Sequence, residues 1–260
     1  MRKIIAIAAM LASAGAAHAA AQGTAAPQDS AKKPPAEWEF TVAPYVLAPT
    51  MQGATGIGSL PTINVDASAS DIFSHLQGGM MLYFQARKGN WAFATDGIYM
   101  HLGQDVHQDT GWASGSISFK QFAWEGFVLY QFVPKLEVGL GFVFNKLDGK
   151  ISATLTPGAG DTTVSTTMSQ SWWDPTLAMR WRPISGEHWS AVLFADYGGT
   201  SGSNWTWQVM PSVGYRFSKL FELAVQYRWI GIKYSTGTGS DYFVYDMNVF
   251  GPQMGFLFHF

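Results

Sequence analysis

The sequence contains no cysteine and carries little charge. Because none of the 260 residues is cysteine, disulfides and thiolate metal sites are excluded. Charged residues make up 13% of the chain, about half the usual share, and a water-soluble surface needs more charge than this. The formal net charge of -2 gives no basic field, so nucleic acid is not expected as a partner.

Long hydrophobic runs are also missing beyond the N-terminal region. No later stretch approaches the roughly 18 consecutive apolar residues of a membrane-spanning helix. Aromatic residues are abundant instead, with 11 Trp, 18 Phe and 10 Tyr. If a chain of this kind enters a membrane, it has to cross it as a closed β-barrel, because only helices and closed barrels satisfy their backbone groups in lipid.

The N-terminal region has the form of a secretory signal peptide. Arg2 and Lys3 precede a short apolar stretch, and Ala17-His18-Ala19 resembles a signal-peptidase site. A spanning helix is the alternative, but the apolar stretch is too short for one. We predict a signal peptide at 1–19, a disordered periplasmic leader at 20–36, which is rich in Ala, Gln, Pro and Lys, and a barrel at 37–260.

Apolar and polar residues alternate along most of the remaining chain. Between residues 204 and 217 one face of the extended chain is polar or small and the other is apolar. The same period recurs at 38–46, 122–132, 136–145, 173–181 and 221–229. A soluble barrel would bury its apolar face, but here that face is also aromatic, with Trp and Tyr near segment ends, as a membrane girdle requires. The pattern predicts an all-β fold, an antiparallel up-and-down transmembrane β-barrel.

Turn signals give the number of strands. Short connections are predicted at 88–90, 133–135, 183–187 and 218–219, and longer polar ones at 51–75, 103–113, 157–161, 198–203 and 235–242. Short connections are typical of the periplasmic side of such barrels and long ones of the external side. Together they join ten strands. Within the first long loop, residues 62–66 could form an extra hairpin arm and residues 71–76 a short helix, so twelve strands is the alternative.

The C-terminal segment reads as a last strand that closes against the strand at 38–46. Phe256, Phe258 and Phe260 fall on its lipid face. The spacing of Gln253, Gly255, Phe258 and Phe260 resembles the terminal signal of outer-membrane barrels. That resemblance implies the barrel-assembly machinery as a partner during biogenesis.

Several motifs resemble a family of proteobacterial outer-membrane barrels without an assigned function. They are Pro44-Tyr45, Trp173-Asp174-Pro175, Asp196-Tyr197-Gly198-Gly199, Trp205-Thr206-Trp207-Gln208, Gly214-Tyr215-Arg216-Phe217 and Tyr227-Arg228. The resemblance covers residues 38–260 and implies a barrel in the outer membrane of a Gram-negative bacterium, in contact with its lipids and lipopolysaccharide. It implies no activity.

The alternation also predicts which charges face the lumen. The lumen acids are Glu39, Asp96, Glu125, Glu137, Asp174, Asp196 and Glu222, and the bases are Arg87, Arg180, Arg182, Arg216 and Arg228. Pairing around the connections places Arg216 opposite Glu222 and Glu137 opposite Arg180, which favours ion pairs. The interior of a barrel with about ten strands is little wider than its side chains, so a filled core or a thin water path is expected.

One predicted pair brings like charges together. Pairing around residues 183–187 places Asp174 opposite Asp196, and like charges that face each other are destabilising. Either Arg228 offsets them from across the lumen, or the two acids form a cation or basic-ligand site with Asn204 and Gln208 as neighbours.

No catalytic constellation emerges from the sequence. The histidines do not combine with a nucleophile and an acid on one face, and no two have ligand spacing for a metal. We therefore expect no enzyme and no cofactor. The leading hypothesis is a structural or surface-interaction role with unknown external partners. The alternatives are a narrow channel for small solutes and a lipid-modifying enzyme.

Overall fold

A computed structural model of the chain describes residues 37–58, 62–107, 113–155, 162–201 and 204–260. The predicted signal peptide and leader lie outside these residues. The strands are β1 (Trp38–Leu47), β2 (Thr50–Ile57), β3 (Ile63–Ala67), β4 (Leu76–Lys88), β5 (Trp91–His107), β6 (Ala113–Val133), β7 (Leu136–Leu155), β8 (Thr162–Ser185), β9 (Trp189–Ser201), β10 (Asn204–Arg216), β11 (Phe221–Thr236) and β12 (Phe243–His259). The helices are α1 (Ala69–Ser74) and the 3-10 turn η1 (Gly239–Asp241).

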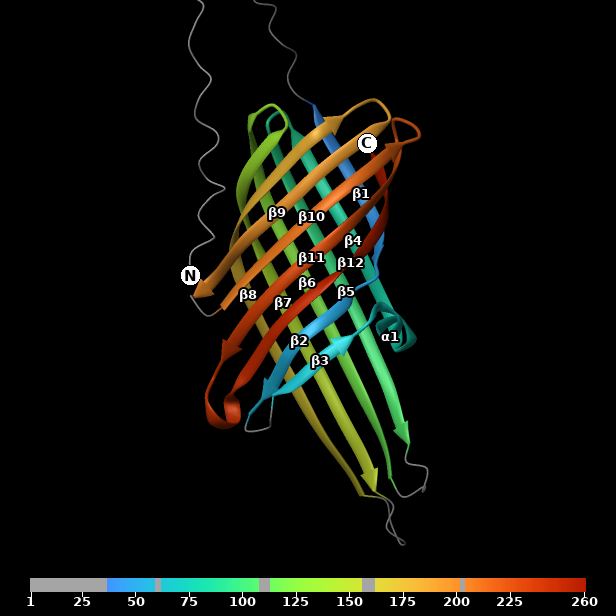
Figure 1. Cartoon of the computed structure of the whole chain (residues 1–260), viewed down its shortest axis with the longest axis vertical. Coiled ribbons are helices and arrows are strands. Elements are labelled where there is room, and N and C mark those ends of the chain that lie inside the picture. The colour runs from blue at the N-terminus through green and yellow to red at the C-terminus, as the bar shows by residue number, and fades with distance from the viewer. Residues whose placement is uncertain (1–36, 59–61, 108–112, 156–161, 202–203) are drawn as a thin grey trace, which may run out of the picture. The chain divides into compact units, whose positions relative to one another are not determined.

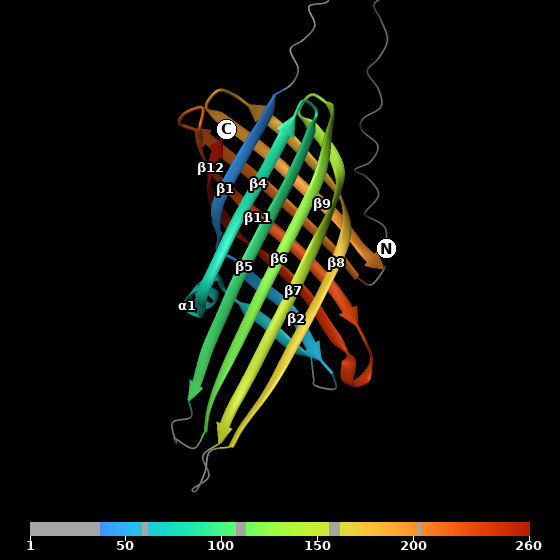
Figure 2. The same cartoon turned by 180° about the vertical axis from the view of Figure 1, so that it is seen from behind.

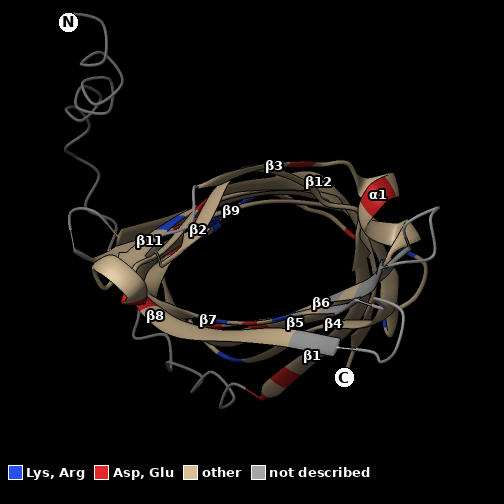
Figure 3. Cartoon of the chain, turned by 90° about the horizontal axis from the view of Figure 1, so that it is seen from below, with Lys and Arg blue, Asp and Glu red and all other residues tan. Residues whose placement is uncertain are grey.

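Ten of the strands form a closed antiparallel barrel, as predicted. Strands β4 to β12 pair in chain order, and β1 closes the ring by pairing with both β4 and β12 (Figures 1 and 2). Seen from below, the strands form a flattened ring (Figure 3). The predicted closure of the C-terminal strand on the first strand is confirmed, with Val42 opposite Phe258.

The other two strands form a hairpin outside the ring. Its second strand, β3, corresponds to the predicted arm at 62–66, whereas β2 occupies a segment predicted as loop. β2 continues the line of β1 along the external half of β12, and β3 pairs with β2. The chain between β1 and β2 passes so close to β12 that a Cβ on Gly251 would lie 2.0 Å from the carbonyl oxygen of Ala48, so only glycine fits there. The sheet therefore has twelve strands, of which ten form the barrel.

Helix α1 lies between β3 and β4, which do not pair with each other among the described residues. Ser68 caps its first turn, because its hydroxyl accepts from the backbone N–H of Asp71, whose carboxylate accepts from the N–H of Ser68. Ile72 is buried and packs against Leu47 and Met100 of the barrel interior. No helix of the described residues is long and apolar enough to cross a membrane.

The predicted register of the lipid face is confirmed. In β8, Trp173 and Leu177 are 59% and 65% exposed, whereas the intervening Asp174 is 1% exposed. The same alternation holds at the C-terminus, where Phe256 and Phe260 point outward. The barrel therefore presents an apolar and aromatic exterior, as a lipid environment requires.

Three strands continue well beyond the membrane. β6, β7 and β8 have 21, 20 and 24 residues, whereas about 9 to 11 residues suffice to span the bilayer. Toward the end opposite the short turns their outward residues become polar, as the Lys146–Asp148 ion pair of 3.4 Å illustrates. The neighbouring strand β5 is also longer than predicted, because residues 103–107, predicted as loop, belong to it.

The predicted pairing of β8 with β9 is wrong by four residues. Asp196 lies opposite Ala178 and not opposite Asp174. The prediction centred the turn on residues 183–187, but β8 continues past Pro183 to its end at Ser185, through a register shift. Proline is compatible with a strand at such an irregularity, so it was misread as the turn itself.

Candidate functional site in the barrel interior

The barrel interior has three levels along its axis, and a buried polar cluster forms the middle one. Arg228 of β11, Asp96 of β5 and Glu125 of β6 form its centre, and Arg228 is only 1% exposed. On the side of the short turns lies a cavity of about 430 Å³, and on the external side lies an apolar core. Asp96 and Glu125 line the cavity, so the cluster forms its floor.

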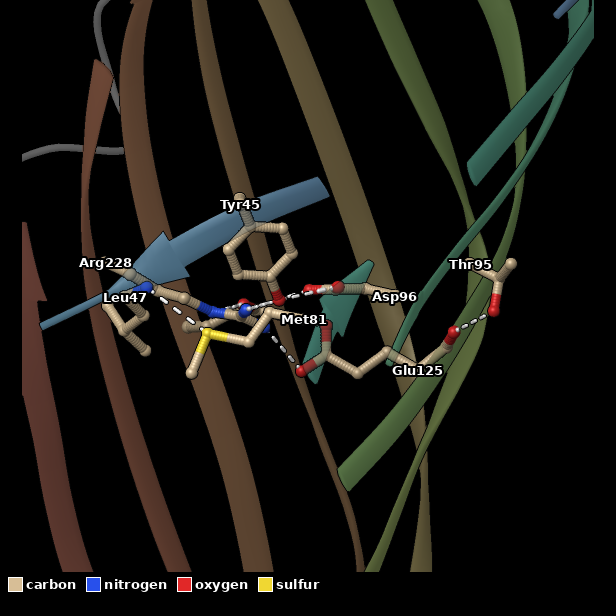
Figure 4. A network of polar contacts seen from close by, with 8 residues as sticks. Tyr45, Leu47, Met81, Thr95, Asp96, Glu125 and Arg228 are labelled. Carbon is tan, nitrogen blue, oxygen red and sulfur yellow. Dashed lines mark hydrogen bonds and ion pairs between the residues drawn. The ribbon is translucent and has the colours of Figure 1, made fainter. Parts of the chain in front are cut away.

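The guanidinium of Arg228 is held by ion pairs and hydrogen bonds in one network. Its Nη1 lies 2.8 Å from Asp96 and its Nη2 lies 2.7 Å from Glu125. Its Nε donates to the amide oxygen of Gln208 at 3.0 Å, and the amide nitrogen of Gln208 donates to Glu125 at 2.9 Å. Tyr45 of β1 donates to Asp96 at 2.7 Å. Figure 4 shows Arg228 reaching toward Tyr45, Asp96 and Glu125.

The acidic pair that needs a cation is therefore Asp96 and Glu125. These residues lie directly opposite each other on β5 and β6, where like charges are destabilising. Arg228 reaches them from β11 and neutralises one of the two charges. The predicted connection at 103–113 could not give this pair, because pairing around its centre puts Asp96 opposite Lys120. In the structure β5 continues to His107, which brings Asp96 opposite Glu125.

The predicted lumen site is only partly brought together. Gln208 and Arg228 belong to the cluster, and Asp196 lies beside it, opposite Gln208 on the neighbouring strand. The predicted role of Arg228 is wrong, because its ion pairs are with Asp96 and Glu125. Asp174 pairs with Val143 of β7, away from Asp196. Asn204 bonds to Ser235, whose N–H donates to the amide oxygen at 2.8 Å.

A second cluster gathers three arginines on one glutamate. Glu137 of β7 is 1% exposed. Arg180 of β8 donates to it through Nε at 2.6 Å, as the strand pairing predicts, and Arg182 lies 3.1 Å away. Arg87 reaches the same carboxylate from β4. Ala92 of β5, which lies opposite Arg87 in the strand pairing, is completely buried.

The predicted pair of Arg216 and Glu222 is also present, at 3.1 Å. Glu222 additionally accepts from the hydroxyl of Ser190 at 2.6 Å and lies 3.0 Å from the imidazole of His259. His259 lies in the segment that resembles the assembly signal, of which Gln253 and Gly255 also face the lumen. The role of that signal in assembly stays a prediction.

The external level is filled by apolar and aromatic side chains from facing walls. The ring of Trp172 on β8 stacks on Tyr234 of β11, with 4.4 Å between centroids and 7° between planes. Phe243 and Tyr245 of β12 pack against the same indole. The buried members of this core are Leu147, Trp172, Ile232, Phe243, Tyr245 and Met247.

Two further observations concern catalysis. Within the described ranges, no group of three or more His, Asp or Glu residues could hold a metal ion. Two serines contact histidines in the described residues. Oγ of Ser118 on β6 lies 3.0 Å from Nε2 of His101 on β5, and Oγ of Ser74 in α1 lies 3.0 Å from Nδ1 of the adjacent His75. The contact of Ser118 with His101 was not predicted, because the two residues are diagonal neighbours across the strands and not directly paired.

Comparison with known proteins identifies the fold. The outer-membrane protease OmpT of Escherichia coli superposes with a TM-score of 0.55 at 7% identity, over 86% of this chain and 97% of that chain. Two other barrels match with lower TM-scores. The CymD monoaromatic hydrocarbon channel has a TM-score of 0.34 at 9% identity, over 86% of this chain and 88% of that chain. Neisserial surface protein A has a TM-score of 0.31 at 11% identity, over 85% of this chain and 96% of that chain. No family model and no curated protein matches the sequence.

The chain is thus an outer-membrane β-barrel of the Gram-negative type. This conclusion rests on the closed ten-strand ring, its apolar exterior and the match in fold to an outer-membrane protein. The narrower family indicated by the sequence motifs stays a prediction.

Proposed function

We propose that the protein is a non-conducting barrel with a structural or surface-interaction role in the outer membrane. The observation that carries this proposal is the Arg228 cluster, which occupies the middle of the lumen with a guanidinium that is 1% exposed. The apolar core around Trp172 fills the interior beyond it. The polar cluster and the apolar core each block the lumen at a different level, and together they leave no continuous polar path for a hydrated solute.

The external extension gives such a barrel a surface to present. β6 to β8 extend well beyond the length that lipid requires, and Leu147 and Trp172 on β7 and β8 belong to a core shared with β11 and β12. Polar side chains cover the outside, including the ion pair between Lys233 and Asp246 at 3.7 Å. A polar, protruding surface is suited to contact with external partners.

Planar-bilayer recording tests the closed lumen. Purified protein inserted into a lipid bilayer should produce no reproducible single-channel steps, because the polar cluster and the apolar core both block the lumen. An open porin recorded in the same membrane serves as the positive control. Reproducible steps from the protein itself would contradict the proposal and favour the narrow solute channel.

A second candidate, a lipid-modifying enzyme, is favoured by the contact of His101 with Ser118. A neutral imidazole at 3.0 Å from a serine hydroxyl can accept its proton while Oγ attacks an ester carbonyl. The alcohol part of the ester leaves with the proton from the imidazolium, and water then hydrolyses the acyl-serine to a free fatty acid and the serine hydroxyl. The contact lacks an orienting acid, since no carboxylate of the described residues hydrogen-bonds to His101.

Mass spectrometry of lipopolysaccharide and phospholipid incubated with the protein tests this candidate. If it is an enzyme, deacylated lipid should appear with the native protein and with Ser116→Ala, but not with Ser118→Ala. Ser116 is the matched control, because it lies two residues from Ser118 on the same strand. Intact lipid in every sample would exclude deacylation by this pair.

A further inference from the structure

The arginine cluster on Glu137 carries more positive charge than its carboxylate neutralises. Arg87, Arg180 and Arg182 all lie within ion-pair distance of this one side chain. Three guanidiniums against one carboxylate leave a formal excess of two positive charges. Glu39 of β1 faces the same cavity opposite Arg87, but it is exposed and forms no ion pair with a described residue, so it reduces this excess without removing it.

The other charged groups around the cavity are already paired. Arg228 is committed to Asp96 and Glu125, and Arg216 donates to Glu222 through both Nε and Nη2. The excess of positive charge therefore lies on the wall formed by β4, β7 and β8, whereas the Arg228 cluster at the floor has two carboxylates for one guanidinium. An excess of this kind next to a water-filled space attracts an anion.

Two of the three arginines have donors to spare. Arg180 is the most committed of the three, because it donates to Glu137 through Nε and to Gln85 and Tyr83 through Nη1, and its buried Nη2 lies within ion-pair distance of Glu137. Arg182 contacts Glu137 through Nη2 alone, and 27% of its side chain is exposed to the cavity it lines. Arg87 likewise uses only Nη2. The Nε and Nη1 groups of both therefore have no hydrogen-bond acceptor among the described residues.

The space beside these donors suits a small molecule. The cavity of about 430 Å³ includes Ser185 and Gly186 of the β8–β9 turn in its lining, so it reaches the end of the barrel with the short turns. Pockets for small ligands fall in the same range of size. The fork of a guanidinium binds the oxygens of a carboxylate or phosphate in pairs, which a lysine cannot do.

We propose that Arg87 and Arg182, held in place by Glu137 and Arg180, form a binding site for a small oxyanion, a phosphate or carboxylate group, that enters the lumen from the periplasmic side. Glu137 keeps the guanidiniums together while the site is empty. The anion completes the charge balance when it binds. This site is independent of whether the lumen conducts.

Isothermal titration of the detergent-solubilised full chain with inorganic phosphate and with succinate, at constant ionic strength, tests the proposal. Arg182→Gln should weaken binding by about tenfold or more, since it removes charge-assisted hydrogen bonds. Arg216→Gln is the matched control, because it removes an arginine of the same cavity whose donors are occupied, and it should bind as the native protein does. Binding of succinate but not phosphate identifies a carboxylate ligand, and the reverse identifies a phosphate ligand.

Glu137→Gln separates binding from folding. Without its carboxylate the cluster keeps three positive charges, so this variant should be less stable than the native protein without anion and should gain more in melting temperature from phosphate or succinate. Three results would each overturn the proposal. The first is no heat of binding with either anion, and the second is equally tight binding of chloride at the same ionic strength. The third is an equal loss of affinity in Arg182→Gln and Arg216→Gln.

Discussion

Replacement of Arg228 by methionine is expected to destabilise the barrel by about 3 to 5 kcal/mol, the usual cost of breaking a buried ion pair from one side. Arg228 is 1% exposed and is the counter-ion of two carboxylates that face each other on β5 and β6. Without it, Asp96 and Glu125 repel each other in an interior that water reaches poorly. Methionine keeps most of the side-chain volume, so the effect reports on charge more than on packing.

Urea unfolding in lipid vesicles, followed by far-ultraviolet circular dichroism, measures this loss. Arg216→Met is the matched control. It breaks the ion pair with Glu222, in which the arginine side chain is 42% exposed, and should cost about 1 kcal/mol or less. The triple variant Arg228→Met, Asp96→Asn, Glu125→Gln should recover much of the loss, because no charge is left unpaired. Equal losses in the two single variants would contradict the role of the cluster.

The strands and their faces could be predicted because lipid imposes a strict two-residue period. Trp173 points to lipid and Asp174 to the lumen, and this alternation is legible from residue types alone. The pairs Arg216–Glu222 and Glu137–Arg180 could be predicted for a related reason. Each joins neighbouring strands, so the position of one connection fixes the register.

The failures have two physical causes. The register of β8 with β9 depends on where the turn is centred, and β8 runs to Ser185, so the turn lies further along the chain than predicted and Asp196 pairs four residues away from Asp174. Arg228 meets Asp96 and Glu125 across the lumen, between strands that are not neighbours in the ring. No local pattern encodes such a contact, because it depends on the curvature of the closed sheet. The same holds for Arg87 and Glu137, which join β4 to β7.

Adjacent tryptophans on β8 should differ sharply in what they contribute to stability. Trp172→Ala is expected to cost about 3 to 5 kcal/mol, because it opens a cavity in a packed core. The indole is 5% exposed and stacks on Tyr234, with Phe243 packed beside it. Trp173→Ala removes an identical side chain from the lipid face, where it is 59% exposed, and should cost about 1 kcal/mol, the typical effect of a single substitution.

The same unfolding experiment compares the two variants, and each serves as the other's control for the loss of an indole. A larger loss for Trp173→Ala would mean that lipid contacts on the outside stabilise this region more than the interior core does. We expect the larger loss of stability for Trp172→Ala because its indole packs inside the barrel, near the external half of the long strands β6 to β8. Trp172 joins β8 to the facing strands β11 and β12 through its contacts with Tyr234 and Phe243, so its loss leaves a cavity where the two walls meet.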